Sequence, residues 1–328
     1  MNNILKSAAM QINRVKVEAD DNGIRLDRWF RRHHRGLSFV AIAKLARTGQ
    51  IRLNGGRVQV SDKVETGDEI RYPDLRKYLP KENEVRKKAE LTDNKLEQLA
   101  KDLEDAILYM DEDLIVLNKP AGLATQGGNK IVASVDSISK AWTFGKQWRP
   151  KIVHRLDKDT TGVLLLARTP QVAAMLAEGF RNKTTQKIYL AVLNGVPRDM
   201  SGRITAAIGK EEEDSMEFVR PGARNAKPAI TDYNVVDFVL RKAALVEFRP
   251  ITGRTHQLRV HSSILNCPIL GDAKYGRRNP ELMEVNQRKL HLHAYSITVE
   301  IRGKKRTFKA PIPGFFKETL DLLGLEKP

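Results

Sequence analysis

The stretch KIVHRLDKDTTGVLLLAR, residues 151–168, joins a polar loop to an apolar strand. Val163 to Leu166 is a short apolar run of the kind that forms the buried core of a strand. The connection entering it, His154 to Thr161, holds one His, one Arg, two Asp, one Lys and two Thr. Polar loops mounted on rigid strands often carry catalytic groups, so this loop is the first candidate site. The alternative is an Asx- or Thr-stabilised turn that ends at Gly162.

The residues after this strand predict a helix and then a second strand. Thr169 suits the helix cap and Pro170 suits its first position, with the helix extending to about residue 183. Its apolar stripe consists of Val172, Leu176 and Phe180. In KIYLAVLNG, residues 187–195, the side chains alternate between two faces as in a strand, with Tyr189 opposite to Leu190. Tyr189 is either a buried structural tyrosine or a flat surface for a base.

Three further segments complete the pattern around this loop. Residues 114–122 read as a strand that runs into NKPAG, and residues 243–248 are another strand-like run. The segment GRTHQLRVH, residues 253–261, predicts a helix after Gly253, with His256 and Arg259 three positions apart.

Charge and composition divide the chain into parts. Residues 15–80 hold 14 Lys/Arg against 9 Asp/Glu and predict a small basic domain. Residues 81–105 contain no aromatic residue and no Gly and predict a charged, solvated linker, part of it helical. Strand and turn signals dominate residues 106–328. Within them, residues 209–227, acidic at EEED and basic at RPGARNAK, indicate a mobile loop.

The small domain presents basic side chains beside an apolar core pattern. Leu26, Trp29 and Phe30 repeat at helical spacing, and Ser38 suits the cap of a second helix. The apolar stripe predicted for that second helix consists of Phe39, Ile42, Ala43 and Ala46. A hairpin is predicted around Asn54-Gly55-Gly56. The outward residues predicted to bind phosphates are Arg28, Arg31, Arg32, Arg35, Lys44 and Arg47. The alternative is an ordinary solvated helix face.

The excess charge points to a polyanionic partner. The chain of 328 residues has 57 Lys+Arg against 40 Asp+Glu, a net charge of +17, and nucleic acid is the commonest cytosolic polyanion. An anionic membrane would favour a basic amphipathic helix or a polybasic tail, and the charge here is instead spread through the sequence. No apolar run approaches the roughly 20 residues of a membrane span, and no signal peptide is recognised. The single Cys267 fits a reducing compartment, so a cytoplasmic location is expected.

The residues predict neither a metal nor a cofactor. Four histidines, His256, His261, His291 and His293, invite a metal interpretation. No second cysteine supports it, and no HExxH spacing occurs. Walker and dinucleotide-type glycine motifs are also missing, which leaves nucleotide hydrolysis and hydride transfer without a basis.

Several motifs, taken in order, resemble known families. RLDRWFRRHH (25–34), KLARTGQIRLNGGRV (44–58) and VETGDEI (64–70) resemble the S4 RNA-binding domain. NKPAG, HRLDKDTTGVLLLAR, KIYLAVLNG, GRTHQLRVH and GDAKYG (271–276) strongly resemble the RluA-type pseudouridine synthases. The combination is similar to the RluC/RluD-like branch that modifies large-subunit ribosomal RNA. It implies an α+β fold in which a mixed, mainly antiparallel sheet forms the catalytic domain, residues 106–328.

The resemblance also assigns roles. Asp157 is implied as the essential carboxylate, with Arg259 as its bidentate cationic partner. Tyr189 would stack under the uracil and serve in late proton transfer at C5, and Arg155 would intrude into the RNA beside the flipped nucleotide. Asp159, Thr160 and Thr161 would orient the loop. Whether Asp157 attacks the sugar, takes a proton or stabilises a cationic ribose stays open.

The implied reaction is an isomerisation, which needs no cofactor, and ribosomal RNA is the implied partner. Two alternatives remain. One is a noncatalytic RNA-binding or ribosome-assembly factor. The other is a carboxylate-based N-glycosidase that cleaves the same bond and releases free uracil.

Overall fold

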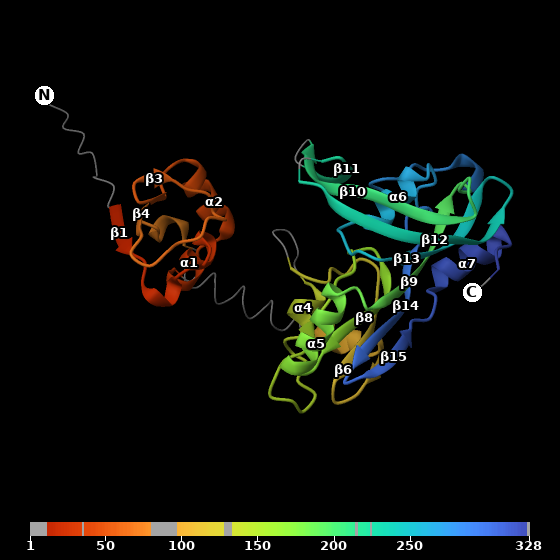
Figure 1. Cartoon of the computed structure of the whole chain (residues 1–328), viewed down its shortest axis with the longest axis horizontal. Helices are drawn as coiled ribbons and strands as arrows, with labels where there is room; N and C mark the ends of the chain where they lie inside the picture. Colours follow the sequence, from red (N-terminus) through yellow and green to blue (C-terminus); the bar gives the residue numbers. More distant parts are fainter. Residues whose placement is uncertain are drawn as a thin grey trace, which may run out of the picture. The chain divides into compact units, whose positions relative to one another are not determined.

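The protein is seen in a computed structural model that describes residues 12–34, 36–79, 97–127, 133–213, 216–223 and 225–326. The chain divides into two units, Met1–Asp93 and Asn94–Pro328, each with its own core (Figure 1). This division falls inside the predicted linker, residues 81–105.

The smaller unit is a sheet with helices packed on it. The strands β1 (Ile12–Lys16), β4 (Glu69–Pro73), β2 (Arg52–Leu53) and β3 (Gly56–Arg57) form an antiparallel sheet in that order. The helices are α1 (Leu26–His33) and α2 (Phe39–Arg47), with 3-10 turns at Ala19–Asp21 and Arg76–Tyr78. The turn between β2 and β3 is confirmed, because Leu53 pairs with Gly56 across Asn54 and Gly55, which both have positive φ.

Packing inside this unit follows the predicted pattern with one displacement. Leu26, Trp29 and Phe30 are buried as predicted, and the Ser38 hydroxyl caps α2 by accepting from the Ala41 N–H. The buried stripe of α2 consists of Ile42, Leu45 and Ala46. Phe39 and Ala43 are only partly buried, and the ring of Phe39 lies 5.9 Å from the guanidinium carbon of Arg31. The predicted stripe was therefore wrong in omitting Leu45.

The larger unit is built on one twisted sheet of eleven strands. Along the sheet the order is β11-β10-β12-β13-β9-β14-β8-β6-β5, with β15 paired to β14 and β7 paired to β8. The strand bounds are β5 Ile107–Met110, β6 Leu114–Lys119, β7 Lys151–Ile152, β8 Thr161–Ala167, β9 Gln186–Asn194, β10 Ser201–Glu213, β11 Met216–Pro221, β12 Lys227–Val239, β13 Ala243–Pro250, β14 Leu292–Ile301 and β15 Lys304–Lys309. Among the described strands only β14 and β8 pair in parallel. The predicted α+β class with a mainly antiparallel sheet is confirmed.

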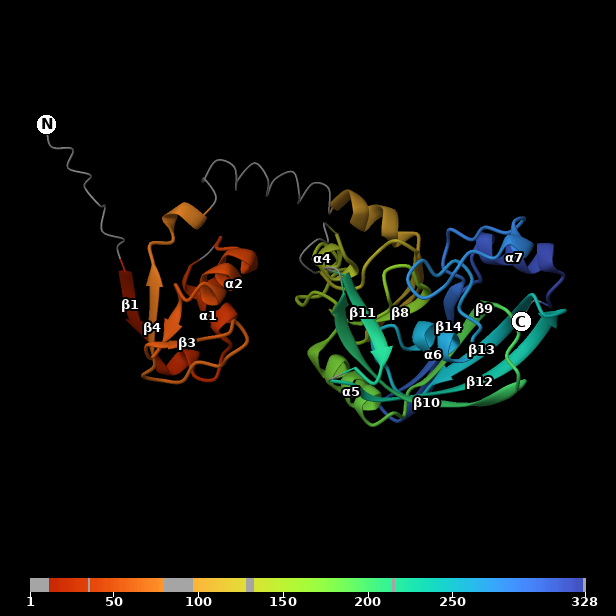
Figure 2. The same ribbon diagram turned by 90° about the horizontal axis from the view of Figure 1, so that it is seen from above.

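Helices cover both faces of this sheet. The helices are α4 (Val135–Ile138), α5 (Pro170–Arg181), α6 (Gln257–Ile264) and α7 (Gly314–Leu323), with a 3-10 turn at Pro280–Leu282. Alternation along β9 directs Ala191 toward the α6 side and Leu190 toward the α7 side. Figure 2 shows α6 lying inside the curve of β10, β12 and β13. Helix α5 begins as predicted, with Thr169 as its cap.

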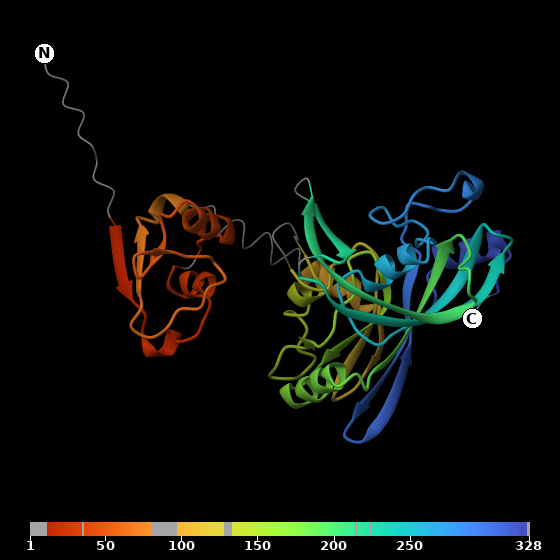
Figure 3. The same cartoon turned by 45° about the horizontal axis from the view of Figure 1, so that its top comes forward.

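Two segments differ from the sequence-based expectation. Residues 209–227, expected as a loop, lie mostly in β10, β11 and the start of β12, and Figure 3 shows the β10–β11 hairpin extending from the body of the sheet. Backbone pairing and the burial of Ile208 and Val219 decide this structure despite the charged sequence. Residues 97–104 of the expected linker are helical, with Leu103 buried in the core of the larger unit; residues 81–96 lie outside the described residues.

The central strands bring distant parts of the sequence together. Ala294 of β14 pairs with Gly162 on one side and with Tyr189 on the other. Tyr189 also pairs with Phe248, two residues before β13 ends. Gly162 has a φ of +111°, and a Cβ there would lie 2.2 Å from the carbonyl oxygen of Ala294. Only glycine fits this close approach, which fixes the polar loop before β8 beside Tyr189.

Candidate active site

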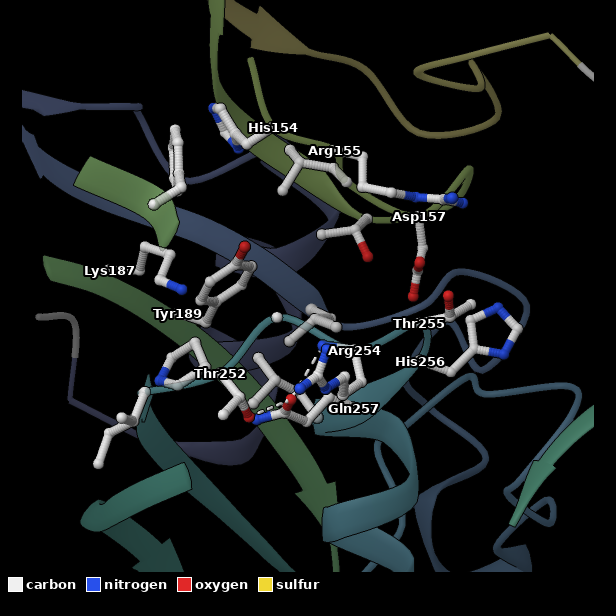
Figure 4. Close-up of a pocket in the computed structure, with 18 of the residues that line it drawn as sticks. His154, Arg155, Asp157, Lys187, Tyr189, Thr252, Arg254, Thr255, His256 and Gln257 are labelled. Atoms are coloured by element: carbon white, nitrogen blue, oxygen red, sulfur yellow. Dashed lines mark hydrogen bonds between the residues drawn. The ribbon is translucent and has the colours of Figure 1, made fainter. Parts of the chain in front are cut away.

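A pocket of about 480 Å³ lies where β8 begins and β13 ends. The loop residues 153–157 line one part of it, Lys187 and Tyr189 of β9 line another, and residues 250–258 complete it. Figure 4 shows Asp157, Arg155 and Tyr189 in this one pocket, together with His256. The structure therefore brings the loop residues Arg155 and Asp157 together with Tyr189 of β9, a residue from another segment that the sequence also singled out.

The loop carrying Asp157 is held by hydrogen bonds from buried groups. The Thr125 hydroxyl donates to the Leu156 carbonyl at 2.7 Å and accepts from the Leu156 N–H at 3.1 Å. The buried Lys119 ammonium donates to the carbonyls of Pro120, Leu123 and Lys158 at 2.8 to 3.0 Å. These contacts tie residues 119–125 to the loop on both sides of Asp157, so the carboxyl has a fixed position before substrate arrives.

His154 and Thr161 fasten the two ends of the same loop. The Leu165 N–H donates to Nε2 of His154 at 2.9 Å, and the His154 ring stacks on Phe180. Burial lowers the pKa of His154 to about 3, with a smaller effect from the positive charge of Lys187. His154 is therefore a neutral structural residue. The Thr161 hydroxyl hydrogen-bonds with Nδ1 of His293 at 2.8 Å, which is consistent with the loop-orienting role implied for Thr161.

Burial dominates the electrostatics of Asp157. Loss of water raises the pKa of Asp157, and the positive charges of Arg259, Arg155 and Lys119 oppose this effect without cancelling it. Burial lowers the pKa of Lys119 to about 7. Asp157 is thus a carboxyl whose ionised form is costly, as expected for a group held in a water-poor pocket.

Tyr189 keeps its proton in this environment. Burial, and then the nearby charge of Asp157, raise the pKa of its hydroxyl. A neutral phenol presents an apolar ring face and a hydrogen-bond donor to the pocket.

The partner of Arg259 is not Asp157. Its Nε and Nη2 atoms bind both carboxylate oxygens of Asp272, at 2.7 and 2.6 Å, and both side chains are buried. Asp272 also accepts from the backbone N–H groups of Lys274 and Tyr275. Burial acts against the ionised form of Asp272, yet the hydrogen bonds and charge of Arg259 outweigh it and lower its pKa. The bidentate pair predicted between Arg259 and Asp157 was wrong, because the GDAKYG segment supplies a closer carboxylate.

A tyrosine of that segment connects Arg259 to the pocket. The ring of Tyr275 lies 5.0 Å from the guanidinium carbon of Arg259, and its hydroxyl hydrogen-bonds with Nδ1 of His256 at 2.7 Å. The same hydroxyl accepts from the Val219 N–H of β11 at 3.0 Å. The sequence analysis quoted this segment without assigning Asp272 or Tyr275. Its two glycines, Gly271 and Gly276, were the signal of a tight loop there, and in the structure a Cβ at Gly271 would lie 1.8 Å from the Lys289 carbonyl oxygen.

The turn before α6 is also fixed by side chains. Gln257 accepts from the Thr252 hydroxyl at 2.7 Å and from the Arg254 N–H at 3.0 Å, and it donates to the Ile230 carbonyl of β12. His256 has a φ of +53° and precedes α6, so it lies outside the helix that was predicted to carry it. A left-handed conformation at a non-glycine residue costs roughly 1 kcal/mol, which the surrounding contacts must maintain.

The four histidines considered for a metal take part in separate hydrogen bonds. His261 pairs with Thr231, His291 with Thr319, His293 with Thr161 and His256 with Tyr275. Among the described residues, no three His, Cys, Asp or Glu side chains come together as a metal-binding group. Within the same residues, no helix has the length and apolar character of a membrane span.

The predicted phosphate-binding residues lie in the smaller unit. Arg28, Arg31, Lys44 and Arg47 are exposed. Arg32 is also exposed but binds Asp21 at 2.7 Å. Arg35 lies outside the described residues.

Comparisons with known proteins show the family of the chain. A family model for RNA pseudouridylate synthases matches residues 113–263. A protein of Rickettsia conorii named ribosomal large subunit pseudouridine synthase C is 38% identical over 298 residues, which is 90% of this chain and 96% of that protein. The protein of the same name from Salmonella typhimurium is 32% identical over 325 residues, covering 97% and 99% of the two chains.

A solved structure supports the same assignment. The human protein titled RNA pseudouridylate synthase domain containing 4 matches with a TM-score of 0.60 and 33% identity, covering 71% of this chain and 98% of that one. The matched relatives are covered over nearly their whole length, and the predicted resemblance to the RluA-type pseudouridine synthases is confirmed. This chain belongs to the RluA-type pseudouridine synthases, enzymes that isomerise uridine to pseudouridine in RNA.

Proposed function

We propose that this enzyme converts uridine to pseudouridine in large-subunit ribosomal RNA in the cytoplasm, with Asp157 as its essential carboxylate. The observation that carries the proposal is the position of Asp157: it lies in a pocket with Tyr189 and Arg155, on a loop that Lys119 and Thr125 hold in place. The names of the relatives support the choice of RNA.

The reaction makes specific demands on these residues. The bond between ribose C1′ and uracil N1 breaks, the base turns and C1′ bonds to C5. The hydrogen on C5 then leaves as a proton and N1 gains one, so the product is an isomer of uridine. Asp157 faces the electron-poor sugar carbon as an anion, and its raised pKa makes the carboxylate a stronger nucleophile and base than an ordinary aspartate. No redox partner or energy source enters this balance.

Tyr189 and Arg155 act on the base and on the RNA. A uridine in structured RNA must leave its stack to reach Asp157. The Tyr189 ring offers a stacking surface for the flipped uracil, and its neutral hydroxyl can donate a hydrogen bond. Arg155 is exposed at the pocket and long enough to enter the space that the base vacates. Arg259 holds the pocket wall through Asp272 and contributes its charge to Asp157 at a distance.

The smaller unit is proposed to be an S4-like domain that positions the RNA. Arg28, Arg31, Lys44 and Arg47 are exposed and suited to phosphate contacts, Arg32 is partly engaged by Asp21, and Arg35 completes the set by sequence.

The deciding experiment maps pseudouridines in ribosomal RNA from cells with and without this gene. Loss of a large-subunit pseudouridine, restored by the wild-type gene and not by Asp157→Asn, supports the proposal. An unchanged map together with free uracil released in vitro would replace it with an N-glycosidase. An unchanged map with RNA binding alone would indicate a noncatalytic factor.

A further inference from the structure

A second cavity, of about 510 Å³, lies beside the catalytic pocket. The two share four lining residues: Lys183, Lys187, Pro250 and Ile251. The rest of the second cavity is lined by Thr185, Gln186, Ile188, Asp232, Arg249, Ser296 and Thr298. None of these described lining residues is aromatic, whereas sites for single-stranded bases use aromatic side chains for stacking. The cavity is suited to the backbone of a nucleic acid rather than to a base.

Lys187 stands at the wall between the two cavities. It is two residues before Tyr189 on β9, so both side chains leave the same face of the strand. It is partly buried, and burial lowers the pKa of its ammonium. Within the described part of the chain, its ammonium has no hydrogen-bond acceptor and no acidic partner. A cation withdrawn from water in this way is stabilised when a ligand brings an anion.

The remaining charges leave the second cavity positive. Asp232, its one acidic lining residue, is bound by Arg203 through hydrogen bonds of 2.6 and 2.9 Å. Arg249 is paired with Glu247 at 2.5 Å. Lys183 and Lys187 therefore remain as the lining cations that no described acidic residue neutralises. The hydroxyl groups of Thr185 and Ser296 add further polar lining.

We propose that this second cavity binds a phosphodiester group adjacent to the flipped uridine, with Lys187 as its principal contact and Lys183 as a secondary one. The inference rests on the proposed function and specifies how the substrate strand leaves the catalytic pocket. A uridine beside Asp157 carries its two flanking phosphates with it, and the shared wall is where the chain can continue. An ammonium at that wall fixes the register of the strand without reading its sequence.

The test combines variants of Lys187 with RNA in which one phosphate is neutral. Target RNA fragments carry a methylphosphonate at one linkage near the uridine, moved one position at a time. With the wild-type enzyme, a methylphosphonate at one flanking linkage should raise KM and lower RNA affinity by roughly 10- to 100-fold. This is the scale of a charge-assisted hydrogen bond. Lys187→Met should show that loss with normal RNA and no further loss at the same methylphosphonate. Lys187→Arg should retain most of the affinity.

A matched control removes a lysine from another part of the same unit. Lys317 is exposed on α7, which packs on the opposite face of the sheet from Tyr189, and Lys317→Met should behave as wild type with every fragment. Thermal unfolding accompanies each variant; because burial disfavours the charged form of Lys187, Lys187→Met should fold at least as well as wild type.

Three outcomes would overturn the proposal. In the first, the loss of affinity from Lys187→Met and the loss from the methylphosphonate multiply at every linkage. Independent losses of this kind would mean that the Lys187 ammonium contacts none of the phosphates tested. A fall in kcat with unchanged affinity would instead give Lys187 a role in the chemistry. An equal loss of RNA affinity in Lys317→Met would mean that the loss in Lys187→Met comes from the lower net charge of the protein and not from a specific contact. RNA affinity is measured on the same fragments. The coupling between Lys187→Met and the methylphosphonate therefore tests the role of Lys187 even if the wild-type enzyme makes no pseudouridine. Absence of pseudouridine would reject only the proposed function.

Discussion

Arg259 binds Asp272 through two hydrogen bonds of 2.7 and 2.6 Å, while it influences Asp157 through its charge alone. The hydrogen bonds of the guanidinium therefore go to Asp272 in the pocket wall, and the carboxylate oxygens of Asp157 stay available to the substrate. This arrangement explains why the pKa of Asp157 remains raised in a pocket that contains several cations.

Asp157→Asn should abolish product formation without loss of stability. Because the pKa of Asp157 is raised in the folded protein, the folded state holds its proton more tightly, and this group lowers stability as pH rises from the ordinary aspartate value through the raised one. At neutral pH the amide removes that penalty. Tritium release from 5-tritiated uridine in RNA and thermal unfolding measure the two effects. Near wild-type release would exclude Asp157 as the essential group.

On the acidic side of the pH–rate profile, activity should fall at a higher pH than it would for a catalytic aspartate with an ordinary pKa. The ionised form of Asp157 is the active one, so kcat/KM should rise with pH through its raised pKa. Arg155 is one of the charges that lowers this pKa, and Arg155→Met should shift this fall in activity to still higher pH. Both expectations are tested by measuring reaction rates across a range of pH, with saturating RNA and with limiting RNA, for the wild-type enzyme and for Arg155→Met. A fall that stays at the same pH in Arg155→Met would show that Arg155 acts on the RNA alone.

Arg259 and Asp272 should behave as a coupled pair. Arg259→Met or Asp272→Asn alone leaves a buried charge without its partner, which should cost about 3 to 5 kcal/mol of stability. The double variant should cost much less than the sum of the single changes. Urea unfolding of all four proteins gives the coupling free energy. Additive losses would mean that the pair contributes little, and a stable Arg259→Met defective only in RNA affinity would make Arg259 a phosphate contact.

Neutralising the exposed basic residues of the smaller unit should weaken RNA binding in a salt-dependent manner. With Arg28, Arg31, Lys44 and Arg47 all changed to Gln, the slope of log affinity against log salt should become shallower by roughly 3, at about 0.7 to 0.9 for each phosphate contact. Catalysis at low salt should largely survive, with a less strict choice of uridine at physiological salt. An unchanged slope and unchanged site choice would identify these residues as an ordinary solvated surface.

The sequence determined the elements whose causes are local. Thr169 and Pro170 specify the start of α5, and the apolar run from Val163 to Leu166 specifies β8. Asn54 and Gly55 adopt the left-handed conformations that their hairpin needs. Each of these features depends on neighbours within a few residues, so its pattern is legible without the fold. The same patterns, with the family motifs, located Asp157 and Tyr189.

The tertiary structure alone decided which distant groups meet. Tyr189 lies beside the Asp157 loop because β14, more than a hundred residues further along the chain, pairs with both β9 and β8. Arg259 pairs with Asp272 because a loop around Gly271 presents a buried carboxylate to α6. The charged β10–β11 hairpin forms because backbone groups pair across it, whatever the side chains prefer. Contacts of this kind depend on the closure of long loops and on the competition between possible partners, which no local pattern records.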